Sequence, residues 1–253
     1  MLQIERRQSI LKYLEENKSA TVEELAKNFD VSAMTIRRDL QYLEDNNLII
    51  RTHGGAVLNT KLDMEIPFKE KSIRHKEEKK RIAEYAASLV EDGQTILLDA
   101  GTTTMEIARR LKDKEDLTIV TSDVFIAGYL ARNSKFRVFC SGGLVQSRIG
   151  ACIGPGAVEF LRNINVDISF IGTSSIDLER GLTTPTLEKA AVKKEMIRAA
   201  QKSILVTDSS KFGIRKFAKI CNLEDFDLII TDSNIPEQVL KELNKLEVNI
   251  KVI

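Results

Sequence analysis

The segment from residue 32 to residue 41 carries the clearest chemical pattern in the chain. Apolar residues at helical spacing are expected to face a core, and they are Ile36, Leu40 and Leu43. Ser32 is expected to cap this helix, whose outer surface then carries Thr35, Arg37, Arg38 and Gln41. Hydroxyl and guanidinium groups on an exposed helix are suited to contact bases and phosphates in a major groove. The pattern predicts a DNA-binding helix, with a helical hairpin carrying two solvated arginines as the alternative.

A second group of residues follows the apolar runs of the later part of the chain, where strands are expected to end. Glycines let backbone N–H groups approach a ligand, a helix N-terminus favours an anion, and hydroxyl groups and a lysine add donors. The candidate ligand residues are Asp99, Gly101, Thr102, Thr103, Thr104, Ser122, Gly142, Gly143, Gly172, Thr173, Ser174 and Lys211. One such loop would be ordinary turn chemistry, but several together predict a site for a small anionic ligand such as a sugar phosphate.

A parallel sheet is needed to bring these loops together. The apolar runs are residues 94–100, 117–122, 137–143, 167–172, 203–208 and 228–232, with 248–253 as a candidate last strand. Helix-like segments separate them, which is typical of a mostly parallel α/β sheet. In the segment 187–201, Glu188, Lys189 and Lys193 are expected either to reach the ligand crevice or to be solvated.

The DNA-binding helix also needs supporting elements. Residues 4–17 predict a first helix, and Thr21 followed by Glu24 is the pattern of a capping box at the start of a second. After the third helix, two β-prone runs meet at Gly54 and Gly55, whose positive φ angles are expected to form a tight hairpin. Three helices followed by a hairpin predict a winged helix-turn-helix.

Two residues of this predicted wing, Arg51 and His53, are expected to contact phosphates or a minor groove. An exposed turn residue is the alternative for His53. Cations cluster locally at residues 6–7, 37–38 and 51–53, although residues 1–60 carry eight Lys or Arg against nine Asp or Glu. Charge alone therefore does not indicate a nucleic-acid partner, and the prediction depends on the clusters.

Composition is that of an ordinary folded protein, with 43% hydrophobic and 30% charged residues among 253. No apolar run approaches the ~18 residues of a membrane span, and no export signal follows the charged N-terminus, so a cytoplasmic location is expected. Three cysteines without a CxxC pair, Cys140, Cys152 and Cys221, favour reduced thiols over disulfides or zinc. With two isolated histidines, no metal site and no cofactor are predicted.

The runs Ser32 to Leu40 and Arg51 to Ala56 resemble the N-terminal domain of the DeoR family of bacterial transcriptional regulators. The runs DAGTTT (99–104), SGG (141–143), FIGTSSID (170–177), GLTTP (181–185) and DSSKFG (208–213) are similar to the effector domain of the same family. That domain is related in fold to ribose-5-phosphate isomerase and responds to phosphorylated sugars or polyols. The resemblance covers essentially the whole chain, although many relatives have glycine where Ser175 stands.

The resemblance implies roles for individual residues. DNA contacts are expected from Ser32, Thr35, Arg37 and Arg38, while Asp39 is expected to pair with a nearby cation. A phosphate cradle is expected at residues 101–104, and the residues expected around the sugar are Gly142, Gly143, Gly172 and Lys211.

Together these patterns predict a sequence-specific repressor of a sugar or polyol operon, controlled by a phosphorylated sugar. Residues 1–57 are the predicted winged helix-turn-helix, 58–75 a solvated connector, and 76–253 the effector-sensing and oligomerisation domain. Expected partners are operator DNA, the effector, and further copies in a homodimer or homotetramer. One alternative is an isomerase-like enzyme with a DNA-binding appendage, in which Asp99 or Glu188 would act with Lys211. The other is a DNA-binding protein whose second domain only oligomerises.

Overall fold

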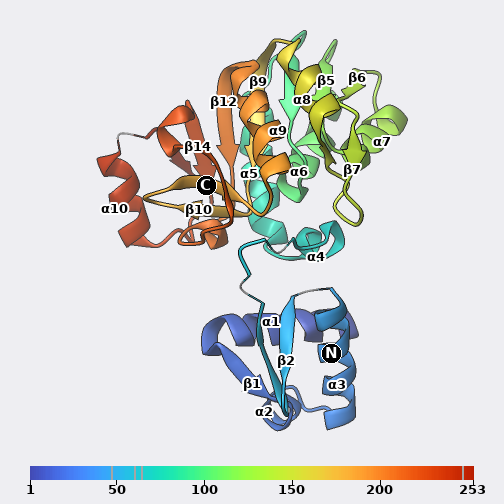
Figure 1. Cartoon of the computed structure of the whole chain (residues 1–253). Helices are drawn as coiled ribbons and strands as arrows, with labels where there is room; N and C mark the ends of the chain where they lie inside the picture. Colours follow the sequence, from blue (N-terminus) through green and yellow to red (C-terminus); the bar gives the residue numbers. More distant parts are fainter. Residues whose placement is uncertain (47, 60, 64, 247) are drawn as a thin grey trace. The chain divides into compact units, whose positions relative to one another are not determined.

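The structure, a computed structural model, describes residues 1–253 except 47, 60, 64 and 247 (Figure 1). The chain forms two compact units, Met1–Glu70 and Lys71–Ile253. Their elements confirm the predicted fold class, which is a winged helix-turn-helix followed by a larger and mostly parallel α/β sheet domain. Within the described ranges, no helix combines the length and the apolar composition that crossing a membrane requires.

The first unit is the winged helix-turn-helix. Its helices are α1 (Gln3–Asn17), α2 (Val22–Asn28) and α3 (Ala33–Asp45). Its antiparallel sheet has the order β1-β3-β2 and consists of β1 (Ser19–Thr21), β2 (Ile49–Thr52) and β3 (Gly55–Leu58). The sequence predicted the hairpin of β2 and β3 but not β1, because a strand of three residues is too short to show an alternating pattern.

Capping and burial explain why these residues form α2 and α3. The Thr21 side chain accepts a hydrogen bond from Glu24 N at 3.1 Å, and the Glu24 carboxylate accepts one from Thr21 N at 2.8 Å. This confirms the predicted capping box. The predicted inward stripe of α3 is also confirmed, since Ile36, Leu40 and Leu43 are fully buried in the core of this unit.

The turn of the wing differs from the prediction. Only Gly54 has a positive φ angle, +85°, while Gly55 is already the first residue of β3. Gly55 is needed for another reason, because a Cβ atom there would lie 2.2 Å from the carbonyl oxygen of Ala20 in β1. The close approach of β1 to β3 thus requires glycine at position 55, whereas turn geometry requires it at position 54.

The second unit is built on a parallel sheet with the strand order β15-β14-β12-β9-β4-β5-β6. Its strands are β4 (Thr95–Leu98), β5 (Thr118–Thr121), β6 (Arg137–Cys140), β9 (Val166–Gly172), β12 (Ala200–Val206), β14 (Leu228–Thr231) and β15 (Ile250–Val252). Each strand falls within or overlaps one of the seven apolar runs, so the predicted parallel sheet is confirmed.

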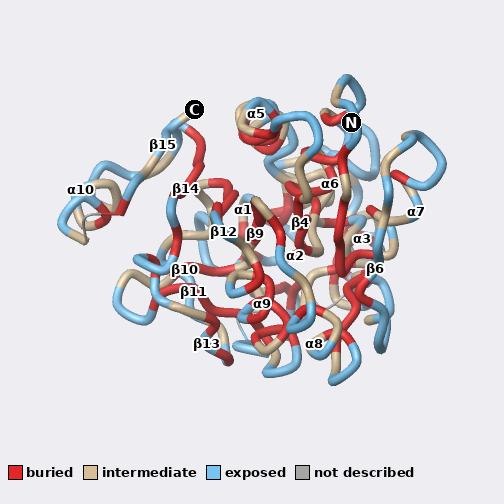
Figure 2. Tube along the Cα trace, turned by 90° about the horizontal axis from the view of Figure 1, so that it is seen from above, coloured by how far each residue is buried: buried red, intermediate tan, exposed pale blue. Residues whose placement is uncertain are grey.

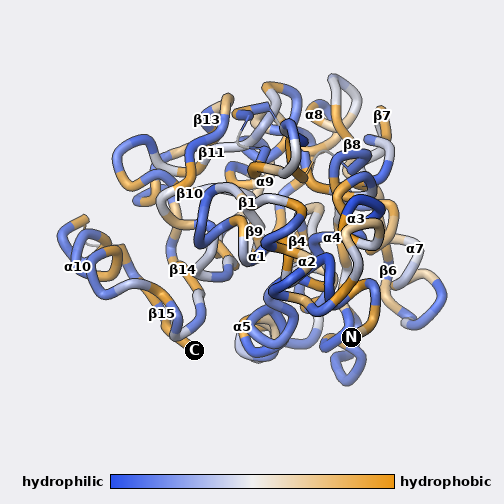
Figure 3. Tube along the Cα trace, turned by 90° about the horizontal axis from the view of Figure 1, so that it is seen from below, coloured by the Kyte–Doolittle hydropathy of each residue, from blue (hydrophilic) through white to orange (hydrophobic). Residues whose placement is uncertain are grey.

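Helix α4 (Phe68–Ile73) spans the boundary of the two units, and α5 (Lys76–Ser88) precedes the first strand of the sheet. The helices between the strands are α6 (Thr102–Arg110), α7 (Val124–Asn133), α8 (Pro155–Arg162), α9 (Leu187–Arg198) and α10 (Glu237–Lys245). The 3-10 turns are η1 (Leu111–Asp113), η2 (Ser209–Lys211) and η3 (Leu223–Asp225). In Figure 3, α5 is mostly blue and therefore hydrophilic, whereas hydrophobic orange segments lie around β4.

Antiparallel additions complete the second unit, and the sequence did not predict them. One sheet contains β10 (Ser175–Asp177), β11 (Gly181–Thr184) and β13 (Ala218–Cys221), and a two-stranded pair contains β7 (Leu144–Val145) and β8 (Cys152–Ile153). These strands are two to four residues long, too short for a clear pattern.

The inner strands of the parallel sheet are mostly buried, as Figure 2 shows for β4 and β9, whereas the edge strands β6 and β15 are mostly exposed. Because neighbouring parallel strands run in one direction, their carboxyl ends meet at one side of the sheet, which is here called the carboxyl edge. Every loop predicted to bind the effector begins at the carboxyl edge.

Candidate functional site

The candidate DNA interface begins at the N-terminus of α3. Ser32 caps this helix by accepting a hydrogen bond from Thr35 N at 3.2 Å, and the Ser32 and Thr35 hydroxyl oxygens lie 3.0 Å apart. Arg37 and Arg38 are exposed on the following turn. Within the described part of the chain, neither guanidinium group forms an ion pair with a carboxylate. All four predicted contact residues of α3 are therefore accessible or partly accessible on one helix.

Asp39 lies on the opposite side of α3 and is fully buried. Its carboxylate accepts hydrogen bonds from Arg6 Nε at 2.6 Å and from Arg7 Nε at 2.9 Å. The guanidinium group of Arg7 also stacks on the ring of Tyr42, 3.6 Å from its centre. As expected, Asp39 has a structural role, and it ties α1 to α3. Arg6 and Arg7 are consequently used inside the domain, although the sequence grouped them with the exposed cations.

The wing residues have different environments. Arg51 Nη1 donates a hydrogen bond to Gln41 Oε1 at 2.6 Å and lies 4.0 Å from a carboxylate oxygen of Glu44, so the wing is held against α3. His53 is exposed in the two-residue turn between β2 and β3. Of the two predicted wing contacts, only His53 lies in the turn at the tip of the hairpin.

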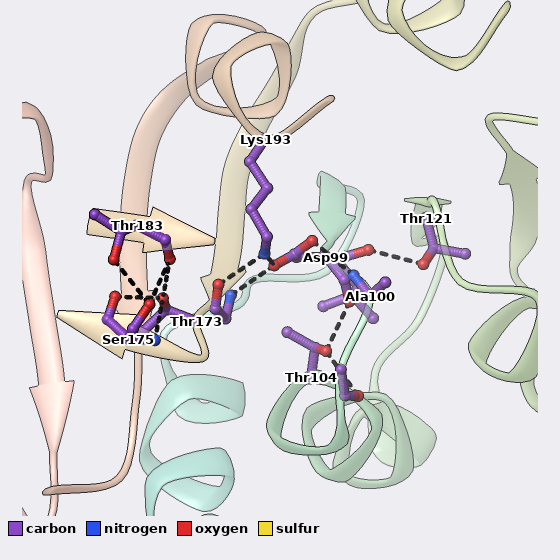
Figure 4. A network of polar contacts seen from close by, with 11 residues as sticks. Asp99, Ala100, Thr104, Thr121, Thr173, Ser175, Thr183 and Lys193 are labelled. Carbon is purple, nitrogen blue, oxygen red and sulfur yellow. Dashed lines mark hydrogen bonds and ion pairs between the residues drawn. The ribbon is translucent and has the colours of Figure 1, made fainter. Parts of the chain in front are cut away.

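In the second unit, Asp99 organises the carboxyl edge (Figure 4). One carboxylate oxygen accepts a hydrogen bond from Ala100 N at 2.7 Å. The other accepts a hydrogen bond from Gly172 N at 2.9 Å and forms an ion pair with Lys193 Nζ. Lys193 also donates to the carbonyl oxygen of Gly172 at 2.8 Å. These contacts join the ends of β4 and β9 to α9. The Asp99 carboxylate, which was predicted to bind the effector, is thus already bonded within the protein.

Sequence reasoning left Lys193 undecided between a crevice residue and a solvated charge, yet it is buried. A signal was present, because Lys193 lies three residues after Ala190 and three before Met196, both buried on the apolar side of α9. Glu188 is exposed, while Lys189 is buried. The acid and base pairs considered for an enzyme, Asp99 or Glu188 with Lys211, are not formed among the described residues.

The predicted phosphate cradle lies at the start of α6. Gly101 is the N-cap residue and has no side chain to cap the first turn, so the N–H groups there have no capping partner from it. A Cβ atom at Gly101 would meet only Thr104 Oγ1, at 3.5 Å, which is an ordinary van der Waals contact. The Thr104 hydroxyl is used internally, since it donates to Asp99 O at 2.7 Å. Within the described residues, the hydroxyl groups of Thr102 and Thr103 form no hydrogen bond.

The loop after β5 contributes a buried carboxylate. Ser122 and Asp123 are both buried, and Asp123 Oδ1 caps α7 by accepting hydrogen bonds from Phe125 N at 2.7 Å and Ile126 N at 3.2 Å. Asp123 Oδ2 is buried and has no hydrogen-bond partner among the described residues. Burial raises the pKa of Asp123 to about 6, against the lowering effect of nearby backbone N–H groups. Sequence analysis did not select this carboxylate.

The loops after β6 and β9 are held mostly by internal contacts. A Cβ atom at Gly143 would lie 2.5 Å from Ile153 O, so this glycine is required by packing, whereas Gly142 faces open space. The Thr173 hydroxyl donates to Ser175 O at 3.0 Å, and the Ser175 hydroxyl donates to Thr183 O at 2.9 Å (Figure 4). Thr173 and Ser175 therefore brace the β9–β10 loop. Ser174, half-buried beside them, remains a candidate for a ligand contact.

The loop after β12 contains a charged cluster that links two parts of the second unit. Lys211 Nζ lies 3.4 Å from Asp208 and donates to Ser210 Oγ at 2.7 Å, while Lys79 of α5 lies 3.7 Å from Asp208. Burial alone raises the pKa of Asp208, but the Lys211 and Lys79 charges lower it to about 2. Burial also lowers the pKa of Lys79 to about 8.

Lys79 also holds the segment that precedes α5. Its ammonium group donates to Lys71 O at 3.1 Å and to Arg74 O. One buried ammonium group therefore contacts both the β12 loop and the chain that leads back to the first unit.

Comparison with known proteins agrees with both parts of this geometry. Residues 6–62 match the model of the DeoR-like helix-turn-helix domain, and residues 74–233 match that of the DeoR C terminal sensor domain. An uncharacterized HTH-type transcriptional regulator of Haemophilus influenzae is 38% identical over 253 residues, which cover 100% of this chain and 98% of the relative. A putative aga operon transcriptional repressor of Escherichia coli O157:H7 is 33% identical, over 98% of this chain and 93% of the relative.

Among solved structures, ribose 5-phosphate isomerase from Plasmodium falciparum is similar, with a TM-score of 0.39 and 20% sequence identity. The similarity covers 54% of this chain and 52% of that one, so the chain spans about half the length of the isomerase. A likeness of this size carries no argument about activity. The matches to the two family models and to the relatives confirm the resemblance seen in the sequence. The chain belongs to the DeoR family of helix-turn-helix transcriptional regulators.

Proposed function

We propose that this regulator represses a sugar or polyol operon by binding operator DNA through α3, and that a phosphorylated sugar or polyol controls it from the carboxyl edge. The observation that carries the DNA part is the exposure of Arg37 and Arg38 beside the capped N-terminus of α3. In a helix-turn-helix, residues near the N-terminus of the second helix contact base edges. The 33% identical aga operon repressor supports the repressing direction.

The effector part of the proposal depends on the start of α6. Uncapped first-turn N–H groups and the helix dipole favour an anion there, and Gly101 has no side chain to cap them. The hydroxyl groups of Thr102 and Thr103 would add hydrogen bonds to it. Ser122, Ser174, Gly142 and Lys211 belong to other loops of the same edge, where the sugar would lie.

The buried carboxylate–lysine pair is the feature of the structure that could suggest an enzyme. Asp99 and Lys193 have the residue types of an acid–base pair, but they are bonded to each other. The Asp99 carboxylate also accepts hydrogen bonds from Ala100 N and Gly172 N, and Lys193 donates to Gly172 O. We therefore propose that they position loops and that the protein is not an enzyme. Incubation with the sugar phosphate that binds, followed by analysis of the sugar, is expected to show no aldose–ketose interconversion above the uncatalysed rate.

We also propose that the protein acts as a homodimer or homotetramer in the cytoplasm, where its operator DNA is found. Two-fold symmetric operators require paired DNA-binding units. Analytical ultracentrifugation of the full chain would determine the copy number. A sedimenting monomer at micromolar concentration would contradict this part of the proposal.

A gel-shift experiment on the full chain tests the DNA interface. Replacing Arg37 or Arg38 by alanine is expected to weaken operator binding by about 1–3 kcal/mol each, because each removes a base-contacting guanidinium group. Lys12→Ala is the matched control, since it removes an exposed cation from α1 instead of α3. If the double arginine variant binds as tightly as the control, the assignment of α3 is wrong.

Thermal unfolding of the full chain tests the effector site with a panel of sugar and polyol phosphates and their unphosphorylated parents. An effector at a hundred times its dissociation constant is expected to add about 2.7 kcal/mol of stability. Lys211→Ala should reduce that gain while leaving operator binding intact. Equal shifts by phosphorylated and unphosphorylated compounds would contradict a phosphate cradle.

A further inference from the structure

Two cysteines that are separate in the sequence lie side by side at the carboxyl edge. The sulfur atoms of Cys140 and Cys152 are 3.8 Å apart. Cys140 ends β6 and is exposed, whereas Cys152 begins β8 and is buried. The third cysteine, Cys221, lies in β13 of a different sheet.

Backbone hydrogen bonds fix the relative position of the pair. Cys140 lies opposite Thr121 in the pairing of β5 with β6. Cys152 N donates to the carbonyl oxygen of the next residue, Ser122, at 2.7 Å. Because both cysteines are attached to consecutive residues at the end of β5, their proximity is built into the sheet and does not depend on the positions of two mobile side chains.

We propose that Cys140 and Cys152 form a reversible intrachain disulfide when the protein meets a small-molecule disulfide oxidant. A disulfide bond needs its sulfur atoms about 2.0 Å apart. Rotation of the two side chains must therefore bring the sulfur atoms closer together by less than about 2 Å. In intracellular proteins, disulfides of this kind are characteristically transient and redox-sensing.

The order of the chemistry follows from exposure. The exposed Cys140 thiolate attacks the oxidant R–S–S–R, which forms a Cys140–S–S–R mixed disulfide and releases one RS⁻ group that takes up a proton. Cys152 then loses its proton, attacks the Cys140 sulfur and displaces the second RS⁻. Two protein thiols are oxidised to one disulfide while the oxidant is reduced to two thiols.

The buried partner makes the second step the slower one. Burial, together with the adjacent Cys140, raises the pKa of Cys152 to about 11. Since the thiolate is the attacking form, closure is expected to accelerate as pH rises from 7 to 9. The geometry decides which sulfurs join, and the pKa affects only the rate.

The disulfide would enclose residues 141–151, which include Gly142 and Gly143 of the candidate effector loop. It would therefore restrict the loop between β6 and β8 in the oxidised protein. This consequence rests on the proposed function, whereas the formation of the bond does not, so a failed operator or effector experiment leaves the thiol chemistry to be judged on its own.

The test treats the folded full chain with glutathione disulfide, quenches with acid and counts free thiols after unfolding. The count is expected to fall from three to one, with a peptide map joining Cys140 to Cys152 within one chain. Dithiothreitol should restore all three thiols. Cys221→Ser is the matched control and should fall from two thiols to none, while Cys140→Ser should keep both of its remaining thiols.

Three results would overturn the proposal. All three thiols could persist in the folded wild type, glutathione could remain bound to Cys140 as a stable mixed disulfide, or the bond could join two chains on a non-reducing gel. Cys140 is the preferred position for the test variant because it is exposed, so its serine substitution is compatible with folding.

Discussion

Four of the buried aspartates show how this chain handles charge at the ends of its elements. Asp39 is paired with two arginines, Asp99 with a lysine and two backbone N–H groups, and Asp208 with two lysines. Asp123 has no cationic partner among the described residues and caps a helix instead. A buried charge is stable only when its environment replaces the water it has lost, so these four sites respond differently to substitution and to pH.

The pair of arginines on Asp39 predicts a large loss of stability in Asp39→Asn. The substitution leaves Arg6, which is itself buried, without a charged partner, and removing one member of a buried ion pair costs about 3 kcal/mol or more. Urea unfolding followed by circular dichroism would measure the loss. Glu16→Gln, on the exposed end of α1, is the control and should change stability by less than about 0.5 kcal/mol.

Asp123 predicts a pH dependence of the opposite sign to that of a salt-bridged carboxylate. Its folded-state pKa of about 6 lies above the ordinary value of 3.8, so the folded chain holds its proton more tightly than the unfolded chain. The stabilising effect of that proton is complete below pH 3.8 and disappears as pH rises through 6. Over this window, Asp123 should remove about 3 kcal/mol from the stability of the fold.

Asp123→Asn keeps an oxygen to accept from Phe125 N and Ile126 N but cannot ionise. Its stability relative to wild type is therefore expected to increase between pH 4 and pH 7 in chemical denaturation experiments. Asp208, whose pKa is about 2, titrates below this window and does not contribute to the pH dependence of the difference. A constant difference between the two proteins from pH 4 to pH 7 would contradict the assignment.

At the scale of elements, the sequence predicted the helices and strands that have a periodic pattern of burial. It missed the strands that form only by pairing with segments distant in the chain. The helices of the first unit and the parallel strands were visible because burial repeats along each element. The short strands β1, β10, β11 and β13 exist only because other segments pair with them. No local pattern in three or four residues reports that pairing.

The candidate site was predictable to the same extent. The loops at the carboxyl edge were found because parallel strands end together, and the exposed residues of α3 because the buried stripe defined its other side. The partners of the charges were not found, since Lys193 lies 94 residues from Asp99 in the chain and Lys79 belongs to an element that precedes the sheet. Pairing over such separations is determined by the folded topology.

Two glycines allow the packing of single elements to be tested. Gly55→Ala is expected to destabilise the first unit by about 1–3 kcal/mol and weaken operator binding, because its Cβ would clash with Ala20 O in β1. Gly128 lies on the exposed side of α7 with open space around it. Gly128→Ala should stabilise the second unit by about 0.5–1 kcal/mol. Urea unfolding of both variants measures the contrast, and equal signs would contradict it.

At the scale of the whole molecule, Lys79 is the described residue that contacts both the β12 loop and the segment preceding α5. A ligand can shift a conformational equilibrium only if it binds two arrangements with different affinity. An effector that contacts Lys211 through its sugar would change the contacts around Asp208, and Lys79 would transmit that change to residues 71–74. The chain continues from there into the first unit.

Lys79→Met is therefore expected to bind operator DNA and effector normally but to lose most of the effect of one on the other. Gel shifts over a range of effector concentrations measure this coupling. Lys80→Met, which removes the neighbouring, partly exposed lysine that pairs with Glu77, is the control and should respond like wild type. Because the pKa of Lys79 is about 8, coupling in wild type should also weaken as pH rises from 7 to 9. A full response in Lys79→Met would contradict this route.

The strand order of the parallel sheet has a consequence for synthesis of the protein. The first unit is made from the first 70 residues and has its own core, so it can fold as soon as those residues leave the ribosome. Strand β4 can pair with β5 soon after both are made, but its other neighbour, β9, begins 71 residues after β4 begins, so the sheet is completed late. In each round of translation the helix-turn-helix unit can thus fold before the sensor domain is complete, and a ribosome that stops early would release the first unit without that domain.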